Sequence, residues 1–462
     1  MPRFTSNQLA EWTGGNWSAR PRGEITGFAT DSRTLVPGQA FVALKTDRRD
    51  GHNFLGDALA AGAPAAIVSA ARADVALPQL RVEDPLRALQ SIGREHRRAA
   101  GAHVVGVTGS AGKTSTKNLL ALLLGGPPAV IATGGNLNNF IGVPLTLARI
   151  EPGSTRFAVV EAGISERGEM RGLAGMIMPD SGVVTLVGPA HLEQLGSIEA
   201  IANEKADLLR HVPSSGVVAF PHQAWAHEPF RQLAAHAIVA LPADASAPAE
   251  SERTRFVPFF LEHGANHTEI LLTGHAGARS FRMRRVSGGM GQNAALAILI
   301  ASELGVSDEA IRVRLADWQP AALRGEVRTI AGRLVYLDCY NANPASMRDA
   351  LEAFVALAPA GAARLFVLGC MEELGRDAAH YHRELGRWLR LGATDRAIAI
   401  GSQADALAAG LAESGQGSVT VAQDVAEIRD IVTSFAGPLF VKGSRRYRLE
   451  TLFPEEAGAA AH

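Results

Sequence analysis

The residues best suited to chemistry lie in one short stretch, VVGVTGSAGKTSTK, at 104–117. An apolar run at 103–107 predicts a buried strand, and 114–124 has the composition of a helix, so a glycine-rich turn joins a strand to a helix. Gly109 and Gly112 allow a tight turn whose N–H groups converge on an anion, and the helix N-terminus adds a positive dipole. The stretch therefore predicts a phosphate-binding loop.

Individual side chains of this loop can be assigned to parts of a nucleotide. Lys113 would reach the outer phosphates, and Thr114 or Ser115 would offer a hydroxyl to Mg²⁺. The strict pattern G-x-x-x-x-G-K-[ST] requires Gly at position 107, where this chain has Val, so the motif is the shorter T-G-S-A-G-K-T-S. An ordinary βα turn is the alternative. We predict that ATP contacts Thr108, Gly109, Ser110, Ala111, Gly112, Lys113, Thr114 and Ser115.

Two further polar side chains follow predicted strands of the same region. Glu161 ends a strand at 157–160, and His191 follows a strand at 183–187. Open α/β sheets bind ligands at the carboxyl ends of their strands. Glu161 is therefore a candidate Mg²⁺ ligand, directly or through water, and His191 is assigned to the same site although Mg²⁺ prefers oxygen. We predict both as catalytic residues, together with Lys113.

The N-terminal part of the chain contains Asp31-Ser32-Arg33 among short strand-like pieces. Arg33 could hold a phosphate by charge-assisted hydrogen bonds, and Ser32 could bind a phosphate or a sugar through its hydroxyl. A solvated turn is the alternative for such a tripeptide. Ser32 and Arg33 are thus candidate substrate-binding residues.

The length of 462 residues suggests about three domains. We place them at 1–97, 98–318 and 319–462. Alternating strand-like and helix-like segments predict an α/β fold, with a mainly parallel sheet in the second domain and a smaller doubly wound sheet in the third.

Composition restricts the partners and the compartment. With 45 basic and 46 acidic residues, no global charge favours nucleic acid or an anionic membrane. The N-terminus lacks an apolar signal core, and the longest apolar stretch, 294–301, is too short to span a bilayer, so we expect a cytoplasmic protein. Cys339 and Cys370 are predicted to be small buried residues, and the pair His380 and His382 a solvated helix start.

A set of further motifs, taken in order, resembles the Mur ligase family of peptidoglycan synthesis. Besides the phosphate loop and DSR, it includes PGQAFVAL and DGHNF, GNLNNFIGVPLTL from Gly135, EAG at 161–163, VGPAHLEQLGS from Val187, NEK at 203–205, DCYNANPASM from Asp338, MEELG at 371–375 and VKGSR from Val441. Within this family, YNANP is typical of the members that add D-alanyl-D-alanine, and the DNPR motif of the diaminopimelate-adding members is missing.

The resemblance implies a division of labour among the three domains. The first would bind a UDP-muramoyl substrate, the second ATP, and the Rossmann-like third would complete the site on closing. The implied reaction joins D-alanyl-D-alanine to UDP-N-acetylmuramoyl-tripeptide through an acyl phosphate, with ATP and Mg²⁺. These small molecules would be the only partners, and we expect a monomer that binds no nucleic acid and does not insert into membranes.

The resemblance also implies roles for further residues. Lys205 matches a family lysine that carries a carbamate, which would make it a catalytic residue and a metal ligand beside Thr114, Glu161 and His191. Asn138 and Asn139 would line the cleft between nucleotide and substrate. The remaining nucleotide contacts would be Asn293, Arg324 and Asp338, while Asn341 and Asn343 would contact the incoming dipeptide. Lys442 would either touch the substrate or hold the loop after the last strand.

Departures from the family's pattern leave room for rival functions. Gly289-Met290 replaces a His-Asn pair, Leu323 replaces a Gly, and Cys339 and Cys370 replace polar residues. They give some support to a catalytically silent, nucleotide-binding relative that acts as a scaffold. A P-loop kinase acting on a hydroxyl would use the same loop. So would a different ATP-dependent carboxylate-amine ligase, such as a folylpolyglutamate synthase, although DSR and DGH argue against that enzyme.

Overall fold

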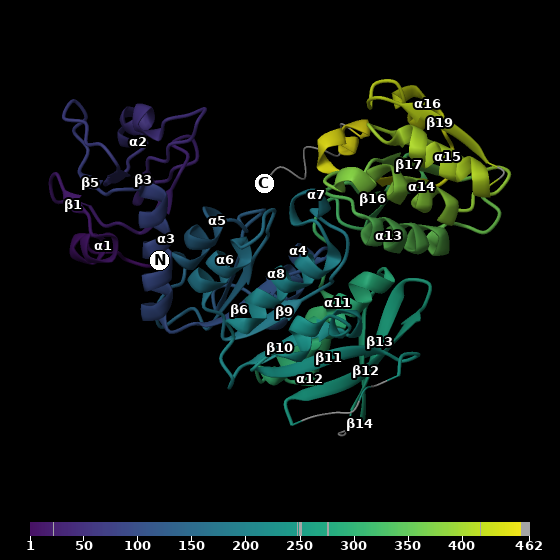
Figure 1. Cartoon of the computed structure of the whole chain (residues 1–462), viewed down its shortest axis with the longest axis horizontal. Helices are drawn as coiled ribbons and strands as arrows, with labels where there is room; N and C mark the ends of the chain where they lie inside the picture. Colours follow the sequence, from purple (N-terminus) through teal and green to yellow (C-terminus); the bar gives the residue numbers. More distant parts are fainter. Residues whose placement is uncertain (22, 247, 249–251, 275–276, 416, 454–462) are drawn as a thin grey trace.

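The computed structural model describes residues 1–21, 23–246, 248, 252–274, 277–415 and 417–453. Three β-sheets follow one another along the chain, and helices pack against each of them (Figure 1). This arrangement confirms the predicted α/β class.

The N-terminal sheet has five strands in the order β1-β5-β4-β3-β2. Strands β2, β3, β4 and β5 run parallel, and β1 pairs antiparallel with β5. The elements are α1 (Ser6–Thr13), β1 (Asn16–Trp17), β2 (Gly27–Ala29), β3 (Gln39–Val42), η1 (Gly51–Phe54), α2 (Leu55–Ala60), β4 (Ala66–Val68), β5 (Gln79–Arg81) and α3 (Pro85–Ala100).

Helix α3 joins this sheet to the next. Its start is fixed by Asp84, whose side chain accepts hydrogen bonds from two backbone N–H groups of the first turn, with Pro85 as the first helical residue. Near its end, Arg97 donates to the carbonyl oxygens of Ala102 and Met178 and pairs with Asp180 at 2.6 Å. Arg97 thus anchors α3 to the central sheet.

The central sheet has nine strands in the order β14-β13-β12-β11-β10-β9-β6-β8-β7. The strands are β6 (His103–Thr108), β7 (Val130–Ala132), β8 (Phe157–Glu161), β9 (Ser181–Val184), β10 (Val217–Pro221), β11 (His236–Pro242), β12 (Thr254–His263), β13 (His267–Gly274) and β14 (Gly277–Arg284). Strands β6 to β12 are parallel, so the carboxyl ends of the neighbours β8, β6 and β9 meet at one edge of the sheet. Strands β13 and β14 add an antiparallel extension that the sequence did not predict.

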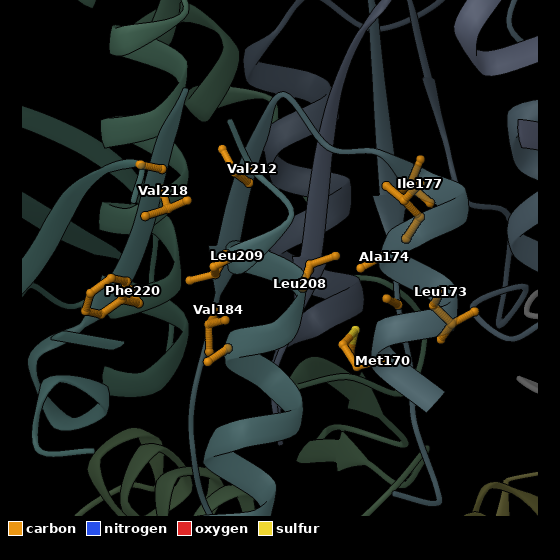
Figure 2. Packing of buried hydrophobic residues seen from close by; sticks show 14 of the residues in the cluster. Met170, Leu173, Ala174, Ile177, Val184, Leu208, Leu209, Val212, Val218 and Phe220 are labelled. Carbon is orange, nitrogen blue, oxygen red and sulfur yellow. The ribbon is translucent and has the colours of Figure 1, made fainter. Parts of the chain in front are cut away.

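Helices cover both faces of the parallel part. They are α4 (Lys113–Leu123), α5 (Gly142–Leu147), α6 (Glu169–Ile177), α7 (Leu192–Leu195), α8 (Ile198–Arg210), α9 (His222–Trp225), α10 (Glu228–Arg231), α11 (Gly288–Glu303) and α12 (Asp308–Ala316). Figure 2 shows one face, where Met170 and Leu173 of α6 and Leu208 and Leu209 of α8 lie side by side in the core. Helices α4 and α11 pack on the opposite face. Burial on both faces explains why these strands are almost wholly apolar.

The C-terminal sheet has six strands in the order β15-β16-β20-β17-β18-β19. All are parallel except β15, which pairs antiparallel with β16. The elements are β15 (Glu326–Ile330), β16 (Arg333–Asp338), α13 (Pro344–Leu357), β17 (Leu365–Gly369), η2 (Gly375–Asp377), α14 (Ala378–Trp388), β18 (Arg396–Ile400), α15 (Ala404–Ser414), β19 (Ser418–Ala422), α16 (Arg429–Ser434), β20 (Leu439–Lys442), η3 (Arg445–Tyr447) and η4 (Leu449–Leu452).

The apolar stretch at 294–301 forms half of α11, and its side chains are buried against the central sheet. In the part of the chain that the structure describes, no helix combines the length and the apolar character needed to cross a membrane. The apolar side chains of 294–301 therefore belong to the core of the central domain.

Candidate active site

The predicted phosphate-binding loop connects β6 to α4, which begins at Lys113, one residue earlier than predicted. The Ser110 hydroxyl donates to the carbonyl oxygen of Gly188 at 2.7 Å and accepts from its N–H at 3.0 Å. The Lys113 ammonium donates to the carbonyl oxygen of Gly109 at 2.9 Å. Burial lowers the pKa of Lys113, while the nearby charge of Glu161 opposes this shift. The loop is thus held in one shape by its own neighbours.

The two loop glycines are required by space as well as by backbone conformation. Gly109 has φ 152°, and a Cβ there would lie 1.9 Å from the Thr185 hydroxyl. Gly112 has φ 78°, and its Cβ would lie 2.2 Å from the Asn293 amide nitrogen. Both values of φ are unfavourable for other residues. The predicted nucleotide residue Asn293 therefore packs directly on the loop from α11.

Glu161 ends β8 beside the loop and is 1% exposed. Its Oε1 accepts a hydrogen bond from the Asn138 side chain at 2.8 Å. Its Oε2 is buried and finds no hydrogen-bond partner among the described residues. A buried carboxylate oxygen without a partner is costly unless a cation or donor binds it. Asn139 instead accepts the N–H groups of Ile141 and Gly142 and so holds the start of α5.

His191 follows β9 and lies in a left-handed conformation with φ 56°. Its Nδ1 contacts a carboxylate oxygen of Glu373, which belongs to the C-terminal part of the chain. The two groups meet as an ion-pair contact, not as a well-aligned hydrogen bond. The contact with His191 lowers the pKa of Glu373. A residue of the C-terminal sheet thus touches the predicted metal ligand.

Lys205 lies on α8 and is 2% exposed. Burial pushes the pKa of Lys205 well below its usual value, and the charge of Lys113 acts in the same direction. Its amino group makes no hydrogen bond or ion pair within the described residues. Such a site favours the neutral amine.

The C-terminal sheet presents polar side chains at the ends of β16 and β20. Asp338 pairs with Lys442 at 2.7 Å, and the same ammonium donates to the carbonyl oxygen of Asn341 at 3.0 Å. Lys442 is 1% exposed. Of the two roles that the sequence left open for Lys442, holding the loop is the one with contacts in the structure. The lysine fixes Asp338 and Asn341 at the sheet edge.

Arg324 lies over the ring of Tyr340, with its guanidinium carbon 3.9 Å from the ring centroid. This cation–π contact orients the arginine toward the space between the two sheets. The preceding residue, Leu323, has φ 61°, a conformation that favours glycine. The family's usual glycine at this position therefore has a backbone explanation, and the leucine adopts the same conformation.

Two contacts join the C-terminal sheet's first helix to the central domain. The Asn343 side chain donates to the carbonyl oxygen of Ser110 in the phosphate loop at 3.0 Å. Asp349 accepts the N–H of Gly289 at 2.7 Å, and a Cβ at 289 would lie 2.8 Å from that carboxylate. Burial raises the pKa of Asp349. The departure at Gly289 thus makes room for a contact between domains.

Asn343→Ala is expected to lower the free energy of unfolding by about 1–2 kcal/mol and to loosen this contact. The reason is that Asn343 also caps α13, accepting the N–H of Ser346 at 2.9 Å. Thermal unfolding and limited proteolysis between the domains measure the two effects. Ser346→Ala removes only the reciprocal part of the cap and is the matched control. Equal proteolysis of both variants would contradict the interdomain role.

One cavity of about 680 Å³ lies between the central and C-terminal sheets. It brings together most of the predicted site, namely Ser110, Ala111, Gly112, Lys113, Thr114, Ser115, Asn138, Asn139, Glu161, His191, Asn293, Arg324, Asp338, Asn341 and Asn343. Thr108, Gly109 and Lys205 are not among the residues that line this cavity. Thr108 is buried and donates to the carbonyl oxygen of Ala162. The residues from the two sheets therefore face one shared space.

Ser32 and Arg33 are not brought to this cavity. They lie at the end of the N-terminal sheet's β2, where Arg33 pairs with Asp31 at 2.6 Å. The hydrogen bond from Arg33 lowers the pKa of Asp31 to about 2. An extended substrate would be needed to contact both places.

The donor set of the cavity fits Mg²⁺ bound together with phosphates. Among the described residues, no group of three or more His, Cys, Asp or Glu side chains is arranged to hold a metal by itself. Mg²⁺ usually binds through one or two carboxylates plus substrate phosphates and water. The unpartnered Oε2 of Glu161, close to the loop that carries Lys113 and Thr114, suits such a site.

Models of protein families match most of the chain. The matches are "Mur ligase family, catalytic domain" at 24–97, "Mur ligase middle domain" at 107–301, and "Mur ligase, glutamate ligase domain" at 323–445. The UDP-N-acetylmuramoyl-tripeptide–D-alanyl-D-alanine ligase of Bacillus subtilis is 32% identical, covering 87% of this chain and 86% of its own. This chain belongs to the Mur ligase family.

Solved structures of the family resemble this Mur ligase over nearly its whole length. MurF from Acinetobacter baumannii matches with a TM-score of 0.85 and 30% identity, covering 98% of this chain and 99% of its own. MurF from Thermotoga maritima, solved in complex with ADP, matches with a TM-score of 0.79 and 26% identity over 95% and 99%.

Sequence reasoning about this Mur ligase missed or misjudged several residues. His382 is fully buried and accepts the N–H of Met371 at 2.8 Å, so the prediction of a solvated helix start was wrong for this residue. Lys113, expected at an exposed loop mouth, is partly buried. Glu373 and Asp349 had no assigned role, although MEELG had been noticed as a motif. Cys339 and Cys370 are buried as predicted, and burial raises the pKa of each to about 12.

Proposed function

We propose that this Mur ligase joins D-alanyl-D-alanine to UDP-N-acetylmuramoyl-tripeptide and cleaves ATP to ADP and phosphate. The observation that carries the proposal is the single cavity shared by the phosphate loop, Glu161 and the C-terminal side chains Arg324 and Asp338. The relatives' names, and the ADP in the Thermotoga maritima structure, supply the substrates to test.

A carboxylate must be activated before an amine can replace its oxygen, because oxide is a poor leaving group. In the proposed reaction, the tripeptide's terminal carboxylate attacks the γ-phosphate of ATP and releases ADP, and the amine of D-alanyl-D-alanine then displaces phosphate from the acyl phosphate. Lys113 and the loop N–H groups from 109 to 114 stabilise negative charge on the transferring phosphoryl group. Arg324, oriented by Tyr340, adds positive charge from the C-terminal side.

Mg²⁺ would be held by Glu161, by the hydroxyl of Thr114 or Ser115, by His191 and by Lys205 as a carbamate. When bound, it neutralises phosphate charge and aligns the phosphoryl group. Asn138 holds Glu161 in place, at 2.8 Å from Oε1. Asp338 and Asn293 would bind the nucleotide, and Asn341 and Asn343 the dipeptide end of the site.

We further propose the domain limits 1–97, 98–318 and 319–462, which agree with the division of the chain into three sheets. The first domain would bind the UDP end through Ser32 and Arg33. The enzyme would work in the cytoplasm as a monomer, without nucleic acid or membrane insertion, since its substrates are soluble small molecules.

The test is phosphate release by the purified chain with ATP, Mg²⁺ and UDP-N-acetylmuramoyl-tripeptide, with and without D-alanyl-D-alanine. We expect release that requires both substrates and a pentapeptide product of the matching mass. Dependence on the added amine excludes a kinase, and a folylpolyglutamate substrate is the control for the related ligases. Nucleotide binding without turnover on any substrate pair would contradict the proposal and favour a silent scaffold.

A further inference from the structure

The segment MEELG, 371–375, stands out in the sequence but has no part in the reaction described so far. It follows β17 and lies against α7 of the central domain, as Figure 1 shows where α7 meets the C-terminal domain. Glu373 contacts Nδ1 of His191 with its carboxylate, and its carbonyl oxygen accepts the N–H of Glu193 at 3.2 Å. One residue therefore touches the His191 loop through both side chain and backbone.

Both residues of this contact have strained backbones. His191 has φ 56° and Glu373 has φ 63°, in the left-handed region that residues other than glycine seldom adopt. Each such conformation is unfavourable in isolation and persists where surrounding contacts hold it. The two residues meet across the boundary between the central and C-terminal domains, and their contacts help to hold both conformations.

The segment is rigidly attached to its own domain. The N–H of Met371 donates to the buried His382 at 2.8 Å. Glu372 accepts hydrogen bonds from the Tyr447 hydroxyl and from Arg446, the second at 3.3 Å. The two adjacent glutamates thus have different tasks, since Glu372 binds within the C-terminal domain and Glu373 reaches across to the central one.

Glu373 and His191 line two different hollows of the surface. His191 lines the cavity that contains the phosphate loop, whereas Glu373 lines a separate groove between α7 and 371–378. The carboxylate of Glu373 contacts Nδ1 of the ring. A carboxylate held against Nδ1 restricts rotation of the ring and so fixes the direction in which Nε2 points.

We propose that Glu373 is a positioning residue that, from the C-terminal domain, fixes the ring direction of His191 in the central domain. The proposal rests on the proposed function, in which His191 binds the metal. It makes the metal site depend on the C-terminal domain, because a carboxylate of that domain holds the ring of His191. Metal-bound histidines depend in this way on an outer carboxylate, whose loss weakens metal binding roughly 10- to 100-fold.

The experiment measures Mn²⁺ binding to the full chain with ADP by electron paramagnetic resonance. Glu373→Ala is expected to weaken Mn²⁺ binding about tenfold, and Glu373→Gln, which keeps an acceptor, to recover part of this loss. Glu372→Ala is the matched control, expected to stay within about twofold because its partners are Tyr447 and Arg446. Wild-type affinity in Glu373→Ala would overturn the proposal.

A double-mutant cycle with His191→Ala separates positioning from general support of the fold. In that background, loss of Glu373 should have no further effect on Mn²⁺ affinity, because the ring to be positioned is gone. The same tenfold loss in both backgrounds, or no effect of His191→Ala itself, would overturn the proposal. Mn²⁺ binding is measured without D-alanyl-D-alanine and without turnover. If the chain failed to ligate, the proposed function would be contradicted, but the measured Mn²⁺ affinities would still test the role of Glu373.

Discussion

Lys113→Ala is expected to abolish ATP-dependent ligation, with a loss of at least about a thousandfold in turnover. Its ammonium lies in the cavity wall beside the Gly109 carbonyl oxygen and close enough to Glu161 for their charges to interact. In this partly buried place, a positive charge aimed at the transferring phosphoryl group is far stronger than in water. Amine-dependent phosphate release, with the product identified by mass, measures the effect.

The fold should survive this substitution. Burial lowers the pKa of Lys113, so the unfolded chain binds more protons there than the folded one between that lowered pKa and about 10.5, and the cost to stability is complete below this window. The charged lysine therefore costs stability at neutral pH, and alanine is expected to leave the melting temperature unchanged or higher. Lys45→Ala, at an exposed lysine 3.7 Å from Asp50, is the activity control. Full ligase activity in Lys113→Ala would refute the phosphate-loop assignment.

The local part of the site could be predicted because it depends on neighbours in sequence. A buried strand, two glycines and a helix start are all visible in 103–124, and α4 differs from the prediction by one residue at each end. Glu161 and His191 were found in the same way, since parallel neighbours β8, β6 and β9 bring their ends together.

The contacts between domains could not be predicted, because they join residues distant in the chain. Asn343 and Ser110 are 233 positions apart, and their hydrogen bond depends on how α13 docks on the phosphate loop. The Glu373 contact depends on the same docking. His382 was misjudged because nothing near it in the sequence completes a zinc set, which left a solvated helix start as the interpretation. The core of the C-terminal sheet instead buries it as an acceptor for Met371.

The departures from the family's pattern become understandable once the backbone is known. Gly289 leaves space for Asp349, and Leu323 packs into the core at 9% exposure while its backbone keeps a glycine-like φ. None of these changes removes a charge from the phosphate loop. This favours a working ligase over a silent relative.

Lys205→Ala is expected to reduce ligation by at least about a hundredfold, because a carbamate on this lysine would supply a metal-binding oxygen. The chain has five lysines. Lys113 and Lys117 donate to backbone carbonyl oxygens, Lys442 pairs with Asp338, and the exposed Lys45 pairs with Asp50. Within the described residues, Lys205 alone lacks such a partner.

Carbon dioxide reacts with a neutral amine, and burial favours that form here by lowering the pKa of Lys205. The carbamate would also turn a costly buried cation into an anion that pairs with a metal.

Carbon-13 magnetic resonance after exposure to labelled bicarbonate should show a carbamate signal that is lost in Lys205→Ala. Short-chain carboxylic acids should restore part of the variant's activity by filling the vacated space. If neither the signal nor the rescue is found, Lys205 is an unmodified buried amine, and the metal must take its remaining ligands from phosphate and water.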